Sequence, residues 1–262
     1  MVVVEWHSEA LHPRADRGLW WPRERTLFIA DPHFGKDAAF RSAGIPVPAA
    51  SGAATIARLD RALRDTEARR LVVLGDFWHA RAGCTQEVLG ELLAFRERFS
   101  SVGIMLIRGN HDLSAGDPPA ELRIECFGEQ SIGPFRLLHE PPEEMEEARS
   151  VAQVAAIAEG GGCAGGASTA YAASGFDSLG AERSSQATLS GVLCGHVHPC
   201  ATFSDSGGSA RFPCFVFDRQ VAVLPAFGEF TGMHRVRPVP ERRIIVAVEN
   251  SIFEVPRQNL LR

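Results

Sequence analysis

Five short polar blocks, each following an apolar run, constrain this chain more than any other feature. Short apolar runs that end in polar residues are typical of buried strands, which expose their last side chains where the loop begins. The blocks supply carboxylate, amide and imidazole groups. In chain order they are Asp31-Pro32-His33, Gly75-Asp76, Gly109-Asn110-His111-Asp112, His139 and Gly195-His196-Val197-His198.

Side chains of these kinds suit two metal ions that share a bridging carboxylate. Two cations roughly 3.5 to 4 Å apart can lower the pKa of a shared water and hold the oxygens of a phosphate ester. Mixed nitrogen and oxygen ligands favour manganese, iron or zinc over calcium. No cysteine lies in the blocks, which argues against a structural zinc site. We therefore expect two divalent ions, with Mn²⁺ first and iron or zinc as alternatives.

Each histidine taken alone is better explained as an ordinary surface or core residue than as a metal ligand. Five blocks in a fixed order, each after a strand-like run, are poorly explained by coincidence. His139 has the weakest local signature, because only its place in the order marks it. The prediction of a metal site therefore depends on the whole set.

The order of the blocks resembles that of the calcineurin-like metallophosphoesterase superfamily, whose pattern is D-x-H, G-D, G-N-H-[DE], H and G-H-x-H. The resemblance extends from about Leu27 to Gly232. Three longer strings are similar to the bacterial DNA ligase-associated phosphoesterases, a branch described as DNA damage response endonucleases. They are IADPHFGK at 29–36, FRSAGIPVP at 40–48 and LPAFGEFTG at 224–232.

This resemblance implies a role for each block. It makes Asp31, His33 and His198 ligands of one metal, Asn110, His139 and His196 ligands of the other, and Asp76 the bridge. His111 would then stabilise the transition state or protonate the leaving oxygen, with Asp112 orienting its ring. The family fold is an α/β sandwich of two mixed β-sheets flanked by helices, with the metals at the strand ends.

Three functions remain open at this point. The blocks favour a dinuclear metal-dependent phosphodiesterase, and the resemblance adds DNA as substrate, an endonuclease role in DNA repair, and a DNA ligase and a helicase as partners. A hydrolase of small phosphodiesters or nucleotides is the first alternative. A non-catalytic scaffold that docks repair partners is the second.

Length and composition are those of one globular domain over 1–262, since 45% of the residues are hydrophobic. No apolar run approaches the roughly 20 residues that cross a bilayer, and no signal-peptide core follows Met1, so we expect a cytoplasmic protein without a membrane partner. The six cysteines form no C-x-x-C pair and indicate reduced thiols.

Apolar runs and helical spacing predict alternating strands and helices. Strands are expected at 27–30, 71–74, 104–107, 135–138 and 192–194, and helices at 53–70 and 85–99. Later runs at 211–217, 220–224 and 244–248 favour a second sheet, with a tight turn at Asp218-Arg219. The glycine-rich stretch at about 143–190 is expected to be a flexible insertion, either a flap over the metals or a tolerated surface loop.

Charge gives mixed evidence for a nucleic-acid partner. The net charge of −5 provides no global attraction to DNA. Residues 11–70, however, carry eleven basic and seven acidic side chains, and two divalent cations would add positive charge where a phosphate binds. We therefore expect any attraction to be local.

Two basic residues near the first block are candidate phosphate contacts. Lys36 is the single lysine beside 26 arginines, and its compact ammonium suits a point contact. Arg41 offers a bidentate guanidinium. Surface charge is the alternative for both residues.

Four further features lie outside the five blocks. His79 is either a residue that orients a metal ligand or an ordinary loop residue, and Glu229 lies in a glycine-flanked turn without an assigned role. The Trp20-Trp21 pair either stacks on bases or covers a core, and the latter is the more frequent use. His7, His12 and His234 are expected at the surface.

Overall fold

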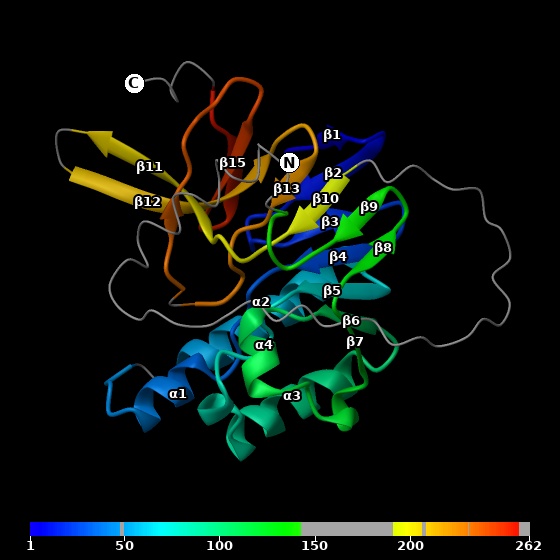
Figure 1. Ribbon diagram of the computed structural model, residues 1–262, viewed down its shortest axis with the longest axis vertical. Helices are drawn as coiled ribbons and strands as arrows, with labels where there is room; N and C mark the ends of the chain where they lie inside the picture. Colours follow the sequence, from blue (N-terminus) through cyan, green and yellow to red (C-terminus); the bar gives the residue numbers. More distant parts are fainter. Residues whose placement is uncertain (48–49, 143–190, 206–207, 230, 257–262) are drawn as a thin grey trace, which may run out of the picture.

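The computed structural model describes residues 1–47, 50–142, 191–205, 208–229 and 231–256. Within these residues the strands form two mixed β-sheets, one of seven strands and one of nine. Figure 1 shows the helices gathered on one side of the molecule, next to the first sheet, with the second sheet beyond it. The predicted class of two mixed sheets with helices is confirmed, and the predicted insertion at about 143–190 lies outside the described residues.

The first sheet runs in chain order from β1 to β7. Its strands are β1 (Val4–Trp6), β2 (Glu9–Pro13), β3 (Leu19–Trp21), β4 (Thr26–Ile29), β5 (Arg70–Leu74), β6 (Gly103–Ile107) and β7 (Ile124–Phe127). Strands β1 to β4 pair antiparallel, and β4 to β7 pair parallel. Strand β4 is buried along its whole length, as expected for a parallel strand covered on both faces.

The helices pack on the outer face of this sheet. They are α1 (Lys36–Ser42), α2 (Ala50–Thr66), α3 (Gln86–Arg98) and α4 (Asn110–Ala115), with short 3₁₀ turns at Arg81–Gly83 and Ala120–Leu122. Leu59 and Leu63 of α2 and Leu92 of α3 join one apolar cluster with the strands beneath them. No helix in the described residues combines the length and the apolar composition needed to cross a membrane.

The expected helix at 53–70 ends four residues early. Helix α2 stops at Thr66, because Glu67 adopts a left-handed conformation with φ of 49° and breaks the helix. The amides of Arg69 and Arg70 then both donate to the carbonyl oxygen of Arg25, which sets β5 beside β4. Helix α3 begins close to its predicted position, after Thr85, whose hydroxyl oxygen accepts the Val88 amide at 3.3 Å.

The second sheet contains the strands that follow. They are β8 (Gln130–Ile132), β9 (Phe135–Leu137), β10 (Gly191–Cys194), β11 (Pro199–Asp205), β12 (Gly208–Phe217), β13 (Val221–Val223), β14 (His234–Arg235), β15 (Arg243–Val248) and β16 (Ser251–Glu254). The order is β14-β11-β12-β13-β10-β9-β8, and β15 joins through β12. Strand β10 pairs parallel with both β9 and β13. The predicted second sheet is confirmed, and it includes strands that the sequence did not suggest.

A shared apolar core joins the two sheets. Trp21 and Phe28 of the first sheet pack in it with Phe135 and Phe217 of the second, and the Trp21 and Phe135 rings meet edge to face with centroids 5.0 Å apart. The sequence pointed to the Trp20-Trp21 pair but not to its strand. Trp21 is buried and Trp20 half-buried because successive side chains of a strand point to opposite faces.

Candidate metal centre

The polar blocks meet at one edge of the sandwich because the strands before them are parallel neighbours. Asp31, Asp76 and Asn110 follow β4, β5 and β6, which lie side by side. His139 and His196 follow β9 and β10 of the second sheet, which also pair parallel. The carboxyl ends of parallel strands share an edge, which is where open α/β sheets bind ligands. All seven predicted metal ligands therefore lie at this edge, six in loops and Asn110 at the start of α4.

An unusual backbone conformation recurs at these residues. Five of the seven have φ between 46° and 67°: Asp31, His33, Asp76, His196 and His198. Residues other than glycine rarely adopt this left-handed region, and each instance costs roughly 1–3 kcal/mol. Such conformations gather at functional sites, where the surrounding structure enforces them.

The first group of side chains contains Asp31, His33 and His198, whose candidate ligand atoms lie within 4.8 Å of one another. His198 Nε2 is 3.7 Å from Asp31 Oδ2. Asp31 Oδ1 and His198 Nε2 are both buried and have no hydrogen-bond partner in the described residues. Buried polar atoms without partners are costly, and a cation between them would remove that cost. This group therefore fits a metal ion.

The second group surrounds His139 Nε2. Asn110 Oδ1 and His196 Nδ1 each lie 3.1 Å from this nitrogen, and Asp76 Oδ1 lies 3.5 Å from it. The other ring nitrogen, Nδ1, is 3.0 Å from the carbonyl oxygen of Leu74, to which it can donate. That hydrogen bond leaves the Nε2 lone pair facing the cluster, the usual arrangement of a ligating histidine. This group also fits a metal ion.

Asp76 lies between the two groups. Its Oδ2 is 3.8 Å from His33 Nε2 in the first group, and its Oδ1 faces His139 in the second. The Oδ1 atom also accepts the backbone amide of His111 at 3.0 Å. Each carboxylate oxygen thus faces a different group.

Burial sets the protonation of the cluster. It lowers the pKa of His33 to about 2 and also lowers that of His196, so both imidazoles are neutral and able to ligate a metal. Burial raises the pKa of Asp76 to about 6. At Asp31 burial opposes ionisation, but the adjacent His198 imidazole, with Nε2 3.7 Å away and positively charged when protonated, outweighs burial and lowers the pKa of Asp31 to about 2.

The glycines of the blocks allow the loops to approach closely. A Cβ atom on Gly75, where φ is +86°, would lie 1.9 Å from His139 Nδ1. One on Gly109 would lie 2.2 Å from Asp76 Oδ1. Any side chain at these positions would therefore displace a candidate ligand.

His111 lies beside the cluster with its ring held by a backbone carbonyl. Its Nδ1 is 2.5 Å from the carbonyl oxygen of His79, and its Nε2 is 3.9 Å from Asp76 Oδ2. Both oxygens of Asp112 accept backbone amides, from Phe77, Trp78 and Gly109. The contact that holds the His111 ring is thus with His79, while Asp112 fastens the loop that carries Asp76.

His79 is part of the site, which its sequence alone left undecided. Its ring stacks on that of His111 with centroids 5.3 Å apart, and the ligand atoms of His33, His79 and His111 form a third close group. Burial and the charge of Lys36 lower the pKa of His79 to about 4. Its position three residues after Asp76 was the available signal.

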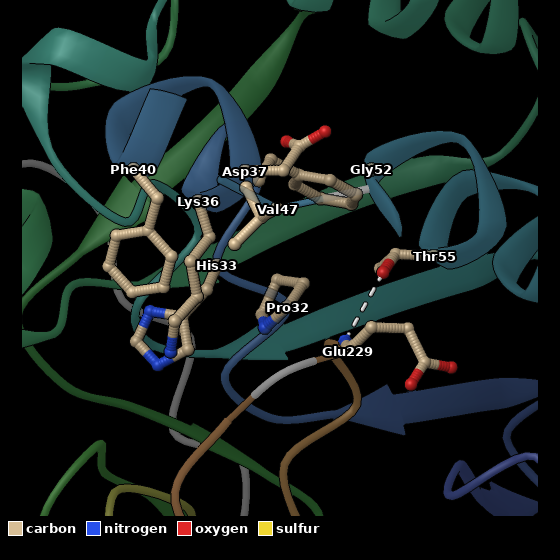
Figure 2. A pocket seen from close by; sticks show the side chains of 10 residues that line it. Pro32, His33, Lys36, Asp37, Phe40, Val47, Gly52, Thr55 and Glu229 are labelled. Atoms are coloured by element: carbon tan, nitrogen blue, oxygen red, sulfur yellow. Dashed lines mark hydrogen bonds between the residues drawn. The ribbon is translucent and has the colours of Figure 1, made fainter. Parts of the chain in front are cut away.

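A small pocket adjoins His33, and Figure 2 shows Lys36, Phe40, Thr55 and Glu229 around it. The Lys36 ammonium lies 5.7 Å from the centre of the Phe40 ring, and its charge contributes to lowering the pKa of His33. The Glu229 amide donates to the Thr55 hydroxyl at 3.4 Å. Lys36 therefore lies near the cluster, as its candidate role requires.

Other candidates lie outside the cluster. Arg41 pairs with Asp37, one turn earlier on α1, at 3.0 Å. The expectation that His7, His12 and His234 are surface residues was wrong in degree, because all three are half-buried. The His234 ring is held by the carbonyl oxygen of Val197, at 2.8 Å from Nδ1.

Comparisons with known proteins find a family model and solved structures that resemble this chain. The family model for calcineurin-like phosphoesterases matches residues 24–200. The crystal structure of Pseudomonas putida nuclease MPE is 34% identical in sequence, with a TM-score of 0.69 over 97% of this chain and 99% of that one. A Vps29 double mutant from Entamoeba histolytica is 13% identical, with a TM-score of 0.32 over 88% and 96% of the two chains. The comparison with curated proteins finds no match.

Proposed function

Because the chain belongs to the calcineurin-like phosphoesterase family and is a metal-dependent phosphoesterase, we propose that it is a dinuclear phosphodiesterase that cleaves DNA. The position of Asp76 between the two groups of side chains carries this proposal. One carboxylate oxygen faces His33 and the other faces His139. A carboxylate placed in this way can join two ions at the spacing used for phosphoryl transfer.

We assign the proposed metal ligands to the two groups of side chains described above. Asp31, His33 and His198 hold one ion, Asn110, His139 and His196 hold the other, and Asp76 joins them. When bound, the ions lower the pKa of a shared water and neutralise phosphate charge. The mixture of imidazole, amide and carboxylate suits Mn²⁺, with iron or zinc as alternatives.

Other residues act on the substrate. The contact of Nδ1 with the His79 carbonyl oxygen leaves Nε2 of His111 facing the substrate side, and Nε2 gives its proton to the departing oxygen when the ring is in its imidazolium form. Asp112 is a positioning residue, since it holds backbone amides rather than substrate. Lys36 contacts a phosphate oxygen. Arg41 does so only through the part of its guanidinium that Asp37 leaves unused.

DNA is the substrate that we propose, for two reasons. The Pseudomonas putida nuclease MPE matches almost the whole chain at 34% identity, and three strings in the sequence are similar to the DNA ligase-associated branch. The similarity of these strings is also why we propose a role in DNA repair with a DNA ligase and a helicase as partners. The proposed cytoplasmic location rests on the sequence features described first. Small phosphodiesters are the alternative substrates, and the acidic net charge permits them.

The test compares plasmid DNA with bis(p-nitrophenyl) phosphate in Mn²⁺ and then in EDTA. We expect both to be cleaved and both activities to stop in EDTA. Asp76→Asn should abolish them, while Glu97→Gln, at an exposed carboxylate on α3 away from the centre, should not. Cleavage of the small diester alone would favour the small-molecule hydrolase. Cleavage of neither, with partner binding that survives Asp76→Asn, would favour the scaffold. Anomalous scattering from crystals grown with Mn²⁺ tests for two ions.

A further inference from the structure

A wide groove lies where the start of the chain, α2 and the second sheet meet. It is lined by the segment between β2 and β3, by one side of α2, by β12 and by the turn between β15 and β16. These elements are far apart in the sequence. None of them carries a predicted metal ligand, so the groove is distinct from the metal centre.

Positive charge predominates in the groove. Its lining includes five arginines and three carboxylates, and two of the carboxylates, Asp16 and Asp65, both pair with Arg14. Glu249 is the one other carboxylate in the lining, beside the four remaining arginines. Four of the eleven basic residues counted in 11–70 thus line this one surface.

Two of these arginines are free to bind a ligand. Arg61 of α2 and Arg211 of β12 are exposed, and neither forms a side-chain hydrogen bond or ion pair within the residues that the structure describes. Arg17 and Arg58 have a different role. They bind the carbonyl oxygens of Gly228 and Phe227, and Arg58 also pairs with the Glu229 carboxylate.

The loop at 226–229 connects the groove to the metal centre. Arg17 in the groove donates to the carbonyl oxygen of Gly228 at 3.1 Å, and the amide of Gly228 donates to the carbonyl oxygen of Asp31 at 3.1 Å. Beyond this loop, Met233 lines the groove, and its neighbour Gly232 has a carbonyl oxygen 3.2 Å from His198 Nδ1. A molecule bound in the groove would therefore be separated from the candidate metal ligands by this loop.

Helix α2 provides a second connection. Thr55 lines the pocket beside His33, and Arg58 and Arg61 line the groove. Residues three apart lie on the same side of a helix, and the helical rise places Arg61 about 9 Å beyond Thr55. Positive side chains thus continue from Lys36 along α2 and away from the centre.

Aromatic surfaces accompany the charge. Trp20 and Phe212 line the groove, and both are half-buried, so each presents part of a ring. Arginines that track a backbone beside aromatic rings are the usual means of binding a polynucleotide chain. An acidic peptide would use the arginines but has no bases to place against the rings.

We propose that this groove binds the sugar-phosphate backbone of the polynucleotide, several nucleotides away from the bond that is cleaved. The proposal rests on the function proposed above, because it gives the phosphodiester substrate its path to the metals. Arg61 and Arg211 contact phosphates, and Trp20 and Phe212 contact bases or sugars. Small diesters do not reach the groove.

The test is a double charge reversal, Arg61→Glu with Arg211→Glu. Its matched control is Arg69→Glu with Arg219→Glu, which makes the same change in net charge at exposed arginines outside the groove. Binding of labelled single-stranded and duplex DNA is measured by fluorescence anisotropy in EDTA, where no cleavage occurs. We expect the groove variant to bind at least about tenfold more weakly than the control variant.

Salt dependence identifies the contacts as phosphate contacts and separates the two forms of DNA. Loss of two phosphate contacts should reduce the slope of log K against log salt by about 1.4 for a single strand and about 1.8 for a duplex. Hydrolysis of bis(p-nitrophenyl) phosphate should stay the same in all variants. Replacing Arg61 and Arg211 by alanine should also weaken DNA binding, by less than the charge reversal does. This milder variant shows whether the effect persists when the charge-reversed protein is misfolded.

Two outcomes would overturn the groove. One is equal DNA binding by the groove and control variants, and the other is displacement of DNA by polyglutamate as effectively as by an oligonucleotide of equal charge.

Failure of the proposed phosphodiesterase function would give a different set of results. In that case the wild-type chain cleaves no ester, while its binding of DNA in EDTA still responds to the groove variant and supports the groove.

Discussion

Two neighbouring arginines form similar ion pairs, and comparing them tests how burial changes the contribution of an ion pair to the free energy of unfolding. Arg242 binds Asp218 through two nitrogens at 2.8 and 2.6 Å, with side-chain exposures of 0% and 4%. Arg243 binds Glu254 in the same bidentate way at 2.8 Å for both contacts, with exposures of 31% and 39%. The bidentate pairing is matched, and the two arginines differ in burial and in a further contact, the hydrogen bond that Arg242 donates to the carbonyl oxygen of Arg237 at 2.8 Å.

The expected cost of removing each arginine follows from that difference. Arg242→Met leaves the Asp218 carboxylate buried without its partner, which destabilises a protein by roughly 3–5 kcal/mol. Arg243→Met breaks a pair that water already screens, worth about 0–1 kcal/mol. For a chain of this size these values correspond to a fall in Tm of roughly 6–20 °C against at most about 4 °C.

Urea unfolding measures both changes. The free energy of unfolding should fall sharply for Arg242→Met with an unchanged m value, and little for Arg243→Met. Adding Asp218→Leu to Arg242→Met should recover part of the loss, because the buried charge is removed as well. Equal destabilisation by the two single variants would refute the reasoning.

Three further predictions concern the metal centre. Gly75→Ala should abolish metal binding and hydrolysis, because its Cβ would lie 1.9 Å from His139 Nδ1. The control Gly90→Ala, in open space on α3, should instead stabilise the fold by about 0.5–1 kcal/mol. Metal analysis and urea unfolding measure the two effects, and full metal content in Gly75→Ala would contradict the first. Adding Mn²⁺ at a hundredfold Kd to EDTA-treated protein should stabilise it by about 2.7 kcal/mol, a rise in Tm that calorimetry would detect and that Asp76→Asn should lack; no rise in the wild type would exclude a metal site. Lys36→Ala should lower kcat/KM on DNA far more than it lowers Tm, and unchanged turnover would make Lys36 an ordinary surface residue.

Much of the fold could be predicted because its signals are local. Apolar runs marked the central strands of both sheets, and helical spacing marked α2 and α3. The three N-terminal strands were not found, because they are short and β2 alternates buried with half-buried residues. They become strands because β3 pairs with β4, β2 with β3 and β1 with β2, and together they cover the core between the sheets.

The candidate residues were local signals too, but their contacts were not. Sequence order identified His139 without showing what it faces, and the structure places it against Asn110 and His196, which are 29 and 57 positions away. It also moved the support of the His111 ring from Asp112 to the carbonyl oxygen of His79. The type of a side chain does not indicate which backbone groups will lie next to it in the folded protein.

The sequence by itself determined which residues end the central strands and which chemistry they offer, because a short apolar run followed by a polar block is a pattern within a few residues. Only the tertiary structure decided that Asp76 lies between two groups and that arginines from α2 and β12 share a groove. Those distances depend on strand pairing across two sheets and on left-handed turns at the strand ends. They are properties of the packed chain, since they arise only when segments distant in sequence come together.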